Sequence, residues 1–421
     1  MRSTRIPFAW LRTAALLSAL TVVLALTGCS SKKNPLIANP LPQLSALAFT
    51  LDTDTLAVGG SATLTFTATD TSGGAVSASR LLWESSAPLV ARVGSTGIVS
   101  AQGEGHAWIR VSGANRTDSV LVVVYTQSGW YAQTSNTVNN LNAIHATADG
   151  RTAWAVGDAG TIVTTNDAGV TWTTQVSNTA FKLNGVFFTS PTRGWVAGNN
   201  GTILSTSNGG VTWARLTNVG ASENLQSVRF VDAAHGWASG SSGAVVRTIN
   251  GGNSWTKVNP TASTLNSVAF SDTLNGWAVG DNGVICGTHD GGVSWYVWQP
   301  AVTNQTLRAA WRASNTRAWA VGAQGVAPSA DATTDSLAWT LGTTGASNQL
   351  YGVHFPTNLT GYAVGQNGSG LVLRSDDGGA SWAPQTANSA QKLNAVWFVD
   401  TQRGWAVGDG GRIVHTSQGG Q

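Results

Sequence analysis

Residues able to carry out acid–base or nucleophilic chemistry are few in this 421-residue chain. Hydrolysis of a glycosidic bond usually needs two carboxyl groups that face the scissile bond, yet Glu223 is the only glutamate after residue 125. The histidines of this region are scattered and lack the short spacings of a zinc site: His145, His235, His289, His354 and His415. We therefore predict no catalytic residue, no metal site and no cofactor.

A second group of candidates is a series of polar side chains, each directly after a leucine at the start of a short apolar run. The series is Asn142, Asn184, Gln226, Asn266, Arg308, Tyr351 and Asn394, with Lys182 and Lys392 nearby in sequence. Amide groups hydrogen-bond to peptides and sugars, so these nine residues are the predicted binding residues if the fold gathers them. The alternative is a solvated surface without a ligand.

The spacing of this series reflects an internal repeat. The phrase GWAVG of residues 276–280 returns seven times with small changes, at intervals of 40 to 43 residues. Its central aromatic residues are Trp154, Trp195, Trp237, Trp277, Trp319, Tyr362 and Trp405. Such a period indicates one unit that stacks on copies of itself. Each unit contains short alternating apolar runs between Gly, Asn and Asp, which is typical of the strands of a propeller blade.

The two ends of the repeat region complement each other. The last unit stops at Gln421, before its outer-strand Trp, while residues 129–133 supply a similar Trp ahead of the first full unit. A blade shared in this way leaves no open sheet edge. We predict an all-β protein in which residues 126–421 form a seven-bladed β-propeller closed by its N-terminal strand. The polar series would then form a ring at one mouth of the central channel.

A second motif precedes the fourth strand of each unit and reads TNDAGVTW at residues 165–172. Its acidic or amide positions are Asp167, Asn208, Asn250, Asp290 and Asp377. The motif resembles the Asp-box of bacterial neuraminidase-type repeats, which implies a structural side chain that satisfies backbone N–H groups of the turn. The fifth turn has Thr334 and Ser336 at the expected Asp and Gly positions, so we expect it to be irregular.

Sialidases also carry Asp-boxes, which makes a sialidase-like glycosidase or a lectin-like glycan binder the alternative function. By that resemblance a sialidase needs an Arg cluster, a Tyr nucleophile with a Glu partner, and an acid Asp. The tyrosines available after residue 125 are Tyr131, Tyr296, Tyr351 and Tyr362. Tyr362 only replaces the repeated Trp, and Glu223 lies in a loop between blades, so a non-catalytic role is favoured.

The repeat phrases also resemble the propeller family of photosystem II assembly and stability factors. That family carries the same Gly-Trp-Ala-Val-Gly and Asp-box phrases and helps to insert and assemble membrane proteins. The resemblance covers about 300 residues. It implies a binding scaffold whose partner is a protein or a membrane-protein complex, as an assembly factor or an adhesion module.

The N-terminus has the features of a targeting segment. Three arginines precede an apolar core, and residues 26–29, LTGC, resemble a bacterial lipobox. We expect residues 1–28 to be a lipoprotein signal peptide and Cys29 to be lipidated, with an ordinary secretory signal as the alternative. Residues 29–43 would be the anchor and tether. Because Ser30 follows Cys29, the expected location is the cell envelope, at the outer membrane and facing the periplasm or the exterior.

Removal of the signal also changes the charge balance. The whole chain carries 23 basic and 20 acidic residues, and three arginines lie before Cys29, which leaves 20 of each. No basic surface therefore argues for a nucleic-acid partner. Cys286 occupies a strand position that is apolar in other units, so we expect a buried thiol.

Residues 44–125 differ in character from the repeats. Their alternating runs, such as residues 62–68 and 119–123, predict strands. Residues 83–93, 97–101 and 105–111 resemble the group 2 bacterial immunoglobulin-like domain, which implies a small β-sandwich. In that family such domains act as spacers or adhesive modules, and we favour the spacer.

Overall fold

The computed structural model describes residues 40–51, 55–103, 105–125, 129–314, 316–331, 338–345 and 348–421. The signal segment, Cys29, most of the tether and the turn around Thr334 and Ser336 lie outside these residues. Apart from six short 3-10 turns, the regular elements of the described ranges are strands, so the all-β prediction is confirmed. Among these residues we find no helix with the length and apolar character needed to cross a bilayer.

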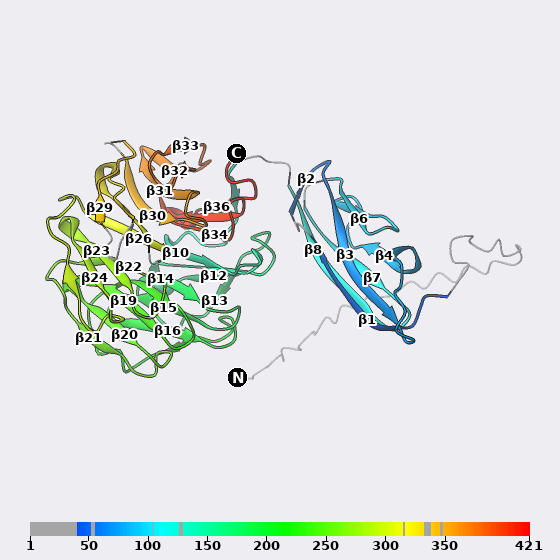
Figure 1. Ribbon diagram of the computed structural model, residues 1–421, viewed down its shortest axis with the longest axis horizontal. Coiled ribbons are helices and arrows are strands. Elements are labelled where there is room, and N and C mark those ends of the chain that lie inside the picture. The colour runs from blue at the N-terminus through cyan, green and yellow to red at the C-terminus, as the bar shows by residue number, and fades with distance from the viewer. Residues whose placement is uncertain are drawn as a thin grey trace, which may run out of the picture.

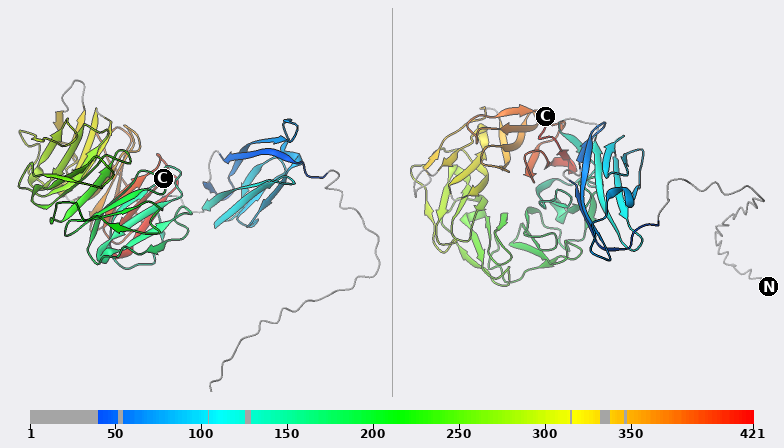
Figure 2. Two further views of the ribbon diagram at one scale, coloured as in Figure 1. Left: turned by 90° about the horizontal axis from the view of Figure 1, so that it is seen from below. Right: turned by 45° about the vertical axis from the view of Figure 1, so that its right-hand side comes forward.

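The repeat region forms seven four-stranded antiparallel sheets, called blades 1 to 7 below (Figure 1). Figure 2 shows them arranged around a ring. Blade 1 comprises β10 (Leu141–Ala146), β11 (Ala153–Gly157), β12 (Ile162–Thr165) and β13 (Thr173–Gln175). Blade 2 comprises β14 (Leu183–Phe188), β15 (Gly194–Gly198), β16 (Thr202–Thr206) and β17 (Ala214–Arg215). Blade 3 comprises β18 (Leu225–Phe230), β19 (Gly236–Gly240), β20 (Val245–Thr248) and β21 (Thr256–Val258). Blades 4 and 5 comprise β22 (Leu265–Phe270), β23 (Gly276–Gly280), β24 (Ile285–Thr288) and β25 (Tyr296–Val297); and β26 (Leu307–Ser314), β27 (Arg317–Gly322), β28 (Ser329–Asp331) and β29 (Ala338–Thr340). Blades 6 and 7 comprise β30 (Gln349–His354), β31 (Gly361–Asn367), β32 (Ser369–Ser375) and β33 (Ala383–Gln385); and β34 (Leu393–Phe398), β35 (Gly404–Gly408), β36 (Ile413–Thr416) and β9 (Tyr131–Gln133).

Blade 7 joins the two ends of the repeat region. Its outer strand is β9, which pairs antiparallel with β36 so that Tyr131 lies opposite His415. The neighbouring Trp130 is fully buried, and its indole Nε1 donates a hydrogen bond to Gln385 of blade 6 at 2.9 Å. The N-terminal strand therefore supplies the edge that blade 7 would otherwise expose, as the complementary ends of the sequence predict.

The central aromatic residue of each repeat packs against the next blade. Trp154 stacks on Phe188 of blade 2 with ring centroids 3.5 Å apart and planes 9° from parallel. The same stacking joins Trp195 to Phe230, Trp237 to Phe270, Trp319 to Phe355 and Tyr362 to Phe398. The indole Nε1 of Trp154 also donates to the carbonyl of Gly209 in the Asp-box of blade 2, at 3.0 Å. The repeated aromatic residue thus fixes the position of one blade on the next.

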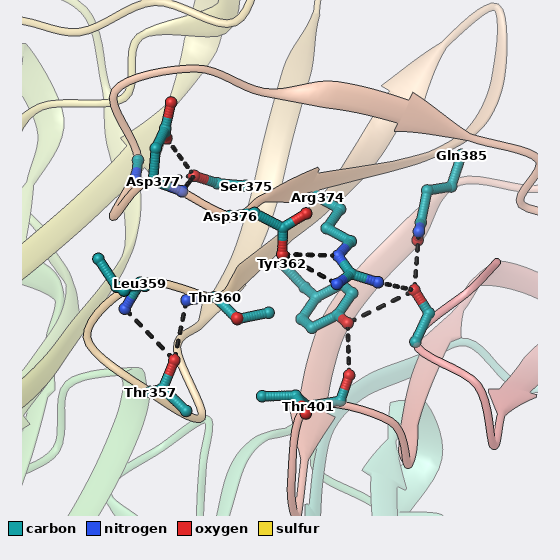
Figure 3. A network of polar contacts seen from close by, with 12 residues as sticks. Thr357, Leu359, Thr360, Tyr362, Arg374, Ser375, Asp376, Asp377, Gln385 and Thr401 are labelled. Atoms are coloured by element: carbon teal, nitrogen blue, oxygen red, sulfur yellow. Dashed lines mark hydrogen bonds and ion pairs between the residues drawn. The ribbon is translucent and has the colours of Figure 1, made fainter.

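Tyr362 shows how a substituted aromatic residue keeps this contact (Figure 3). Its hydroxyl donates to the carbonyl of Thr401 at 2.9 Å and approaches that of Gly419 at 3.4 Å. Arg374 donates to the Gly419 carbonyl at 3.1 Å and pairs with Asp376 at 2.9 Å. A phenol therefore takes the place of the indole at this interface, while Arg374 donates to the Gly419 carbonyl as Arg193 and Arg317 donate to those of Gly251 and Gly378.

Two kinds of turn join the strands within a blade. The turn between the second and third strands places two successive residues in the left-handed region, such as Ala159 and Gly160 in η2 (Asp158–Gly160). Equivalent turns are η3 (Ser241–Gly243), η4 (Asp281–Gly283), η5 (Ala323–Gly325) and η6 (Asp409–Gly411). In the Asp-box turn, Asp377 accepts hydrogen bonds from Ser381 and Ser375, which lower its pKa to about 2. These hydrogen bonds stabilise the hairpin that contains the Asp-box.

Residues 44–125 form two further four-stranded sheets with the strand orders β1-β3-β6-β5 and β2-β8-β7-β4. Their elements are β1 (Leu44–Leu51), β2 (Thr55–Ala57), β3 (Ser61–Asp70), η1 (Ala78–Arg80), β4 (Leu82–Ser85), β5 (Ala91–Val93), β6 (Ile98–Ala101), β7 (Gly105–Ser112) and β8 (Thr117–Tyr125). Buried residues of both sheets, among them Leu64, Val99 and Ile109, share one core. This is a small β-sandwich, and its immunoglobulin-like relationship stays a prediction.

Candidate binding site at the channel mouth

The seven residues of the predicted ring share one structural feature. In every blade the pairing of the innermost two strands shifts register at this residue, for example between Leu141 and Ala143 around Asn142. The same shift occurs at Asn184, Gln226, Asn266, Arg308, Tyr351 and Asn394. The extra residue of a β-bulge is left out of the ladder, which re-aims its side chain. The repeat therefore releases one side chain per blade at the same level of the channel.

All nine predicted binding residues line one cavity of about 490 Å³. Seven are the bulge residues, and Lys182 and Lys392 lie beside them on the loops that lead into β14 and β34. A cavity of this size lies in the range that holds small ligands or a short segment of a partner chain. The structure thus brings the predicted ring together, while its role in binding stays a prediction.

The asparagines of the ring are already engaged with the neighbouring blade. The Nδ2 group of Asn142 donates to the carbonyl of Leu183 in blade 2 at 2.9 Å and to Asp158 at 3.0 Å. Asn184, Asn266 and Asn394 make the same pair of bonds, to the leucine carbonyl of the next blade and to a turn side chain of their own blade. One Nδ2 hydrogen of each asparagine therefore bonds to the next blade and the other to a turn of its own blade, so the amide donors are already used.

Three ring positions carry no asparagine, although Arg308 still donates to the leucine carbonyl of the next blade, with Nη1 3.4 Å from the carbonyl oxygen of Leu350. Gln226, Arg308 and Tyr351 replace asparagine in blades 3, 5 and 6. The guanidinium of Arg308 lies 4.5 Å from the Tyr351 ring, and Nζ of Lys392 lies 4.8 Å from the same ring. Lys392 also pairs with Asp409 at 3.4 Å, whereas no carboxylate of the described residues pairs with Arg308. Arg308, Tyr351 and Lys392, called the cationic sector below, present an aromatic ring and two cations to the cavity.

The deeper part of the cavity has aromatic walls around a second arginine. The guanidinium of Arg229 lies 4.5 Å from the Phe187 ring and 4.6 Å from the Trp311 ring. Trp311 contacts His354 with ring centroids 4.1 Å apart, and Trp397 contacts His354 at 4.5 Å. These five residues all line the cavity and form what we call the channel floor. His145 packs behind it, 4.2 Å from the Trp397 ring.

Burial controls protonation at the floor. Burial and the charge of Arg229 lower the pKa of His145 to about 3. The same two effects, together with His145, lower the pKa of His354 well below its usual value. Burial also lowers the pKa of Arg229 to about 10. At neutral pH the floor therefore carries one positive charge, on Arg229, beside neutral imidazoles.

The residues considered for glycosidase chemistry are not gathered at this cavity. Glu223 lies in the loop before β18 and pairs with Lys257, which lowers the pKa of the carboxyl group. Asp281 is the one carboxylate among the described residues that line the cavity, and it accepts a bond from Asn266 at 3.0 Å. Of the four tyrosines, Tyr351 alone lines the cavity. The arrangement lacks the facing carboxyl pair that most glycosidases use.

Metal and thiol chemistry find no support in the described part of the chain. No group of three or more His, Cys, Asp or Glu side chains gathers there as a metal site requires. Cys286 is fully buried, as predicted, and burial raises the pKa of its thiol to about 12. A thiol held protonated in this way is a poor nucleophile.

Sequence reasoning missed the channel floor as a unit. Its members stand three residues after the ring positions: Phe187, Arg229, Trp311, His354 and Trp397, with His145 and Ala269 in the same column. Of this column, the sequence singles out His145 and His354, as possible metal ligands, but not Arg229. The signal was present in the alignment of the repeats, because one column holds large or charged side chains where a structural position would keep one residue type.

Comparison with known proteins bears on the propeller. The family model "Photosynthesis system II assembly factor YCF48" matches residues 176–259 and 331–421. A structure described as YCF48 bound to D1 peptide is 19% identical, with a TM-score of 0.59 over 70% of this chain and 98% of that chain. YCF48 from Cyanidioschyzon merolae is 21% identical, with a TM-score of 0.57 over 69% and 98%. The WD40 propeller domain of Doa1 is 13% identical, with a TM-score of 0.56 over 69% and 97%. A search of curated proteins found no match.

The fold and its polar channel mouth define an all-β propeller with one cavity at its centre. At these identities the solved structures show similarity of fold alone, and the family model shows similarity of the repeats. The chain contains a photosystem II assembly factor-like β-propeller.

The ring asparagines and Gln226 should differ in their effect on stability. Asn184→Ala removes both inter-blade and intra-blade donors and should lower the free energy of unfolding by about 1–3 kcal/mol. Gln226→Ala, at the equivalent bulge, makes no such bonds among the described residues and should change it by less than about 0.5 kcal/mol. Urea unfolding of both variants measures the difference. Equal losses would contradict the assignment of the asparagines to inter-blade bonding.

Proposed function

We propose that this protein is a lipid-anchored binding scaffold of the cell envelope. Its propeller engages a protein, or a subunit of a membrane-protein complex, through the channel mouth, in the manner of an assembly factor or an adhesion module. The observation that carries this proposal is the sector formed by Arg308, Tyr351 and Lys392. There Arg308 and Tyr351 replace the asparagine of other blades, and an aromatic ring with two cations faces the cavity.

The composition of this sector suits recognition of a protein. Arg and Tyr concentrate binding energy in protein interfaces, because each combines a large contact area with hydrogen-bonding groups. Contact with the two cations orients the Tyr351 ring without burying it, since the residue stays partly exposed. The similarity to a YCF48 structure that holds a D1 peptide supports a peptide segment as the ligand class. It does not extend the D1 protein itself to this chain.

Glycan binding is the second candidate, and one observation favours it. Trp311 and Trp397 line the channel floor, and aromatic faces of this kind stack on sugar rings as well as on side chains. The lone carboxylate of the lining argues for a lectin-like binder over a glycosidase in that case. A lectin would retain a sugar-dependent interaction after the cationic sector is neutralised, whereas a protein-binding mouth would lose its partner.

Partner binding should depend on the cationic sector. Arg308→Ala and Tyr351→Ala should each reduce the amount of envelope protein that co-purifies with the full-length chain by about tenfold or more, because such anchors each contribute about 2 kcal/mol. Arg215→Ala, an exposed arginine on the outer strand β17, is the matched control and should leave it unchanged. Thermal unfolding confirms that the variants are folded. Co-purification that is indifferent to both changes would refute the proposed mouth.

The anchor is a separate part of the proposal and rests on the lipobox-like residues 26–29. Wild-type protein should incorporate labelled fatty acid and fractionate with membranes. Cys29→Ser should lose the label and accumulate as an unprocessed or soluble form, because the thiol is the acylated group. Membrane association of the wild type without any label would overturn lipid anchoring and leave the binding role of the propeller to be judged on its own test.

A further inference from the structure

The channel floor contains buried nitrogen atoms without partners. Nε of Arg229, Nε1 of Trp311 and Nδ1 of His354 are buried, and none has a hydrogen-bond partner among the described residues. His354 is only 3% exposed. Buried polar groups in folded proteins are almost always hydrogen-bonded, and exceptions mark strain, function or a bound group. The three residues belong to three different blades, and all three line the same cavity.

The chemistry of these groups selects their ligand. A guanidinium and an indole can only donate hydrogen bonds, and a neutral imidazole offers one donor and one acceptor. No carboxylate of the described residues pairs with Arg229, and Asp281, the one acid in the lining, is bonded to Asn266. Arg308 and Lys392 add positive charge nearer the mouth. The floor therefore offers donors and positive charge to a group that accepts hydrogen bonds.

The position of the Arg229 side chain favours an acceptor in the plane of its guanidinium. Its Cζ atom lies over the Phe187 ring at 4.5 Å and over the Trp311 ring at 4.6 Å, which are cation–π contacts. The N–H groups lie in the plane and stay available to a planar acceptor. A carboxylate matches this fork with two parallel hydrogen bonds.

We propose that the channel floor is a binding site for one carboxylate group, held by Arg229 with donors from Trp311 and His354. The carboxylate comes either from an acidic side chain of a bound partner segment or from a free small organic acid. Both sources fit a cavity of about 490 Å³. The carboxylate site does not require that the proposed partner binding is correct, because a free acid can occupy it without a protein partner.

Calorimetric titration of the full-length chain tests the site with three probes. They are succinate, an acetylated and amidated hexapeptide with a single Glu, and the same peptide with Gln in place of that Glu. Wild type should bind succinate or the Glu peptide and should not bind the Gln peptide. Binding of succinate alone assigns a free acid, and binding of the Glu peptide assigns a partner side chain.

Two variants and a control test the named donors. Arg229→Gln should weaken the binding of whichever probe is bound by about tenfold or more, since bonds to charged groups are the strongest. Trp311→Phe keeps an aromatic wall but removes the N–H, and should weaken binding by about fivefold. Arg215→Gln should have no effect. Failure of the wild type to bind either acidic probe, equal binding of the Glu and Gln peptides, or binding unchanged in a folded Trp311→Phe protein would overturn the proposal.

Discussion

The contact that recurs at five of the seven blade interfaces is the stacking of an aromatic residue of one blade on a phenylalanine of the next. Trp195 and Phe230, for example, lie with ring centroids 3.6 Å apart and planes 9° from parallel. A blade of four short strands cannot bury both of its faces alone, so stability comes from neighbouring blades. The Phe230 ring also lies against the second strand of its own blade. A Cβ atom at Gly236 in that strand would lie 2.3 Å from Phe230, so the position requires glycine. Trp, Phe and Gly of the repeat are thus one coupled constraint.

The coupling explains where the repeats are allowed to differ. Blades 1 and 5 have Ala146 and Arg312 at the Phe position, and there alanine replaces the glycine, as Ala153 and Ala318. The floor column lies outside this packing and varies between blades, as do the ring positions of Gln226, Arg308 and Tyr351. Variation accordingly collects around the channel, where it changes the chemistry of the cavity without disturbing the contact between blades. This is a physical reason for a binding site at the centre of a regular ring.

Much of the architecture could be predicted because the repeat period, the turn residues and the split last unit each report a local requirement. The placement of the seven ring residues around one cavity follows from their common offset within the repeat. The engagement of Asn142 and its equivalents could not be predicted, because it depends on the bulge that turns each side chain toward the next blade. The aligned repeats place the floor residues in one column, but the distances from Arg229 to Phe187 and Trp311 could not be predicted, since they depend on how three blades converge. Side-chain type alone does not show that an arginine lacks an acidic partner.

Packing between blades shapes the ring, and we propose that the channel mouth binds the partner. Site-specific photo-crosslinking in intact envelopes tests this most directly, with the reactive group at Tyr351 in the mouth or at Val211, which is 79% exposed on an Asp-box turn. We expect a discrete crosslinked partner from position 351 and none from position 211, with the product identified by mass spectrometry. Equal products from both positions, or a partner captured from position 211 alone, would contradict it.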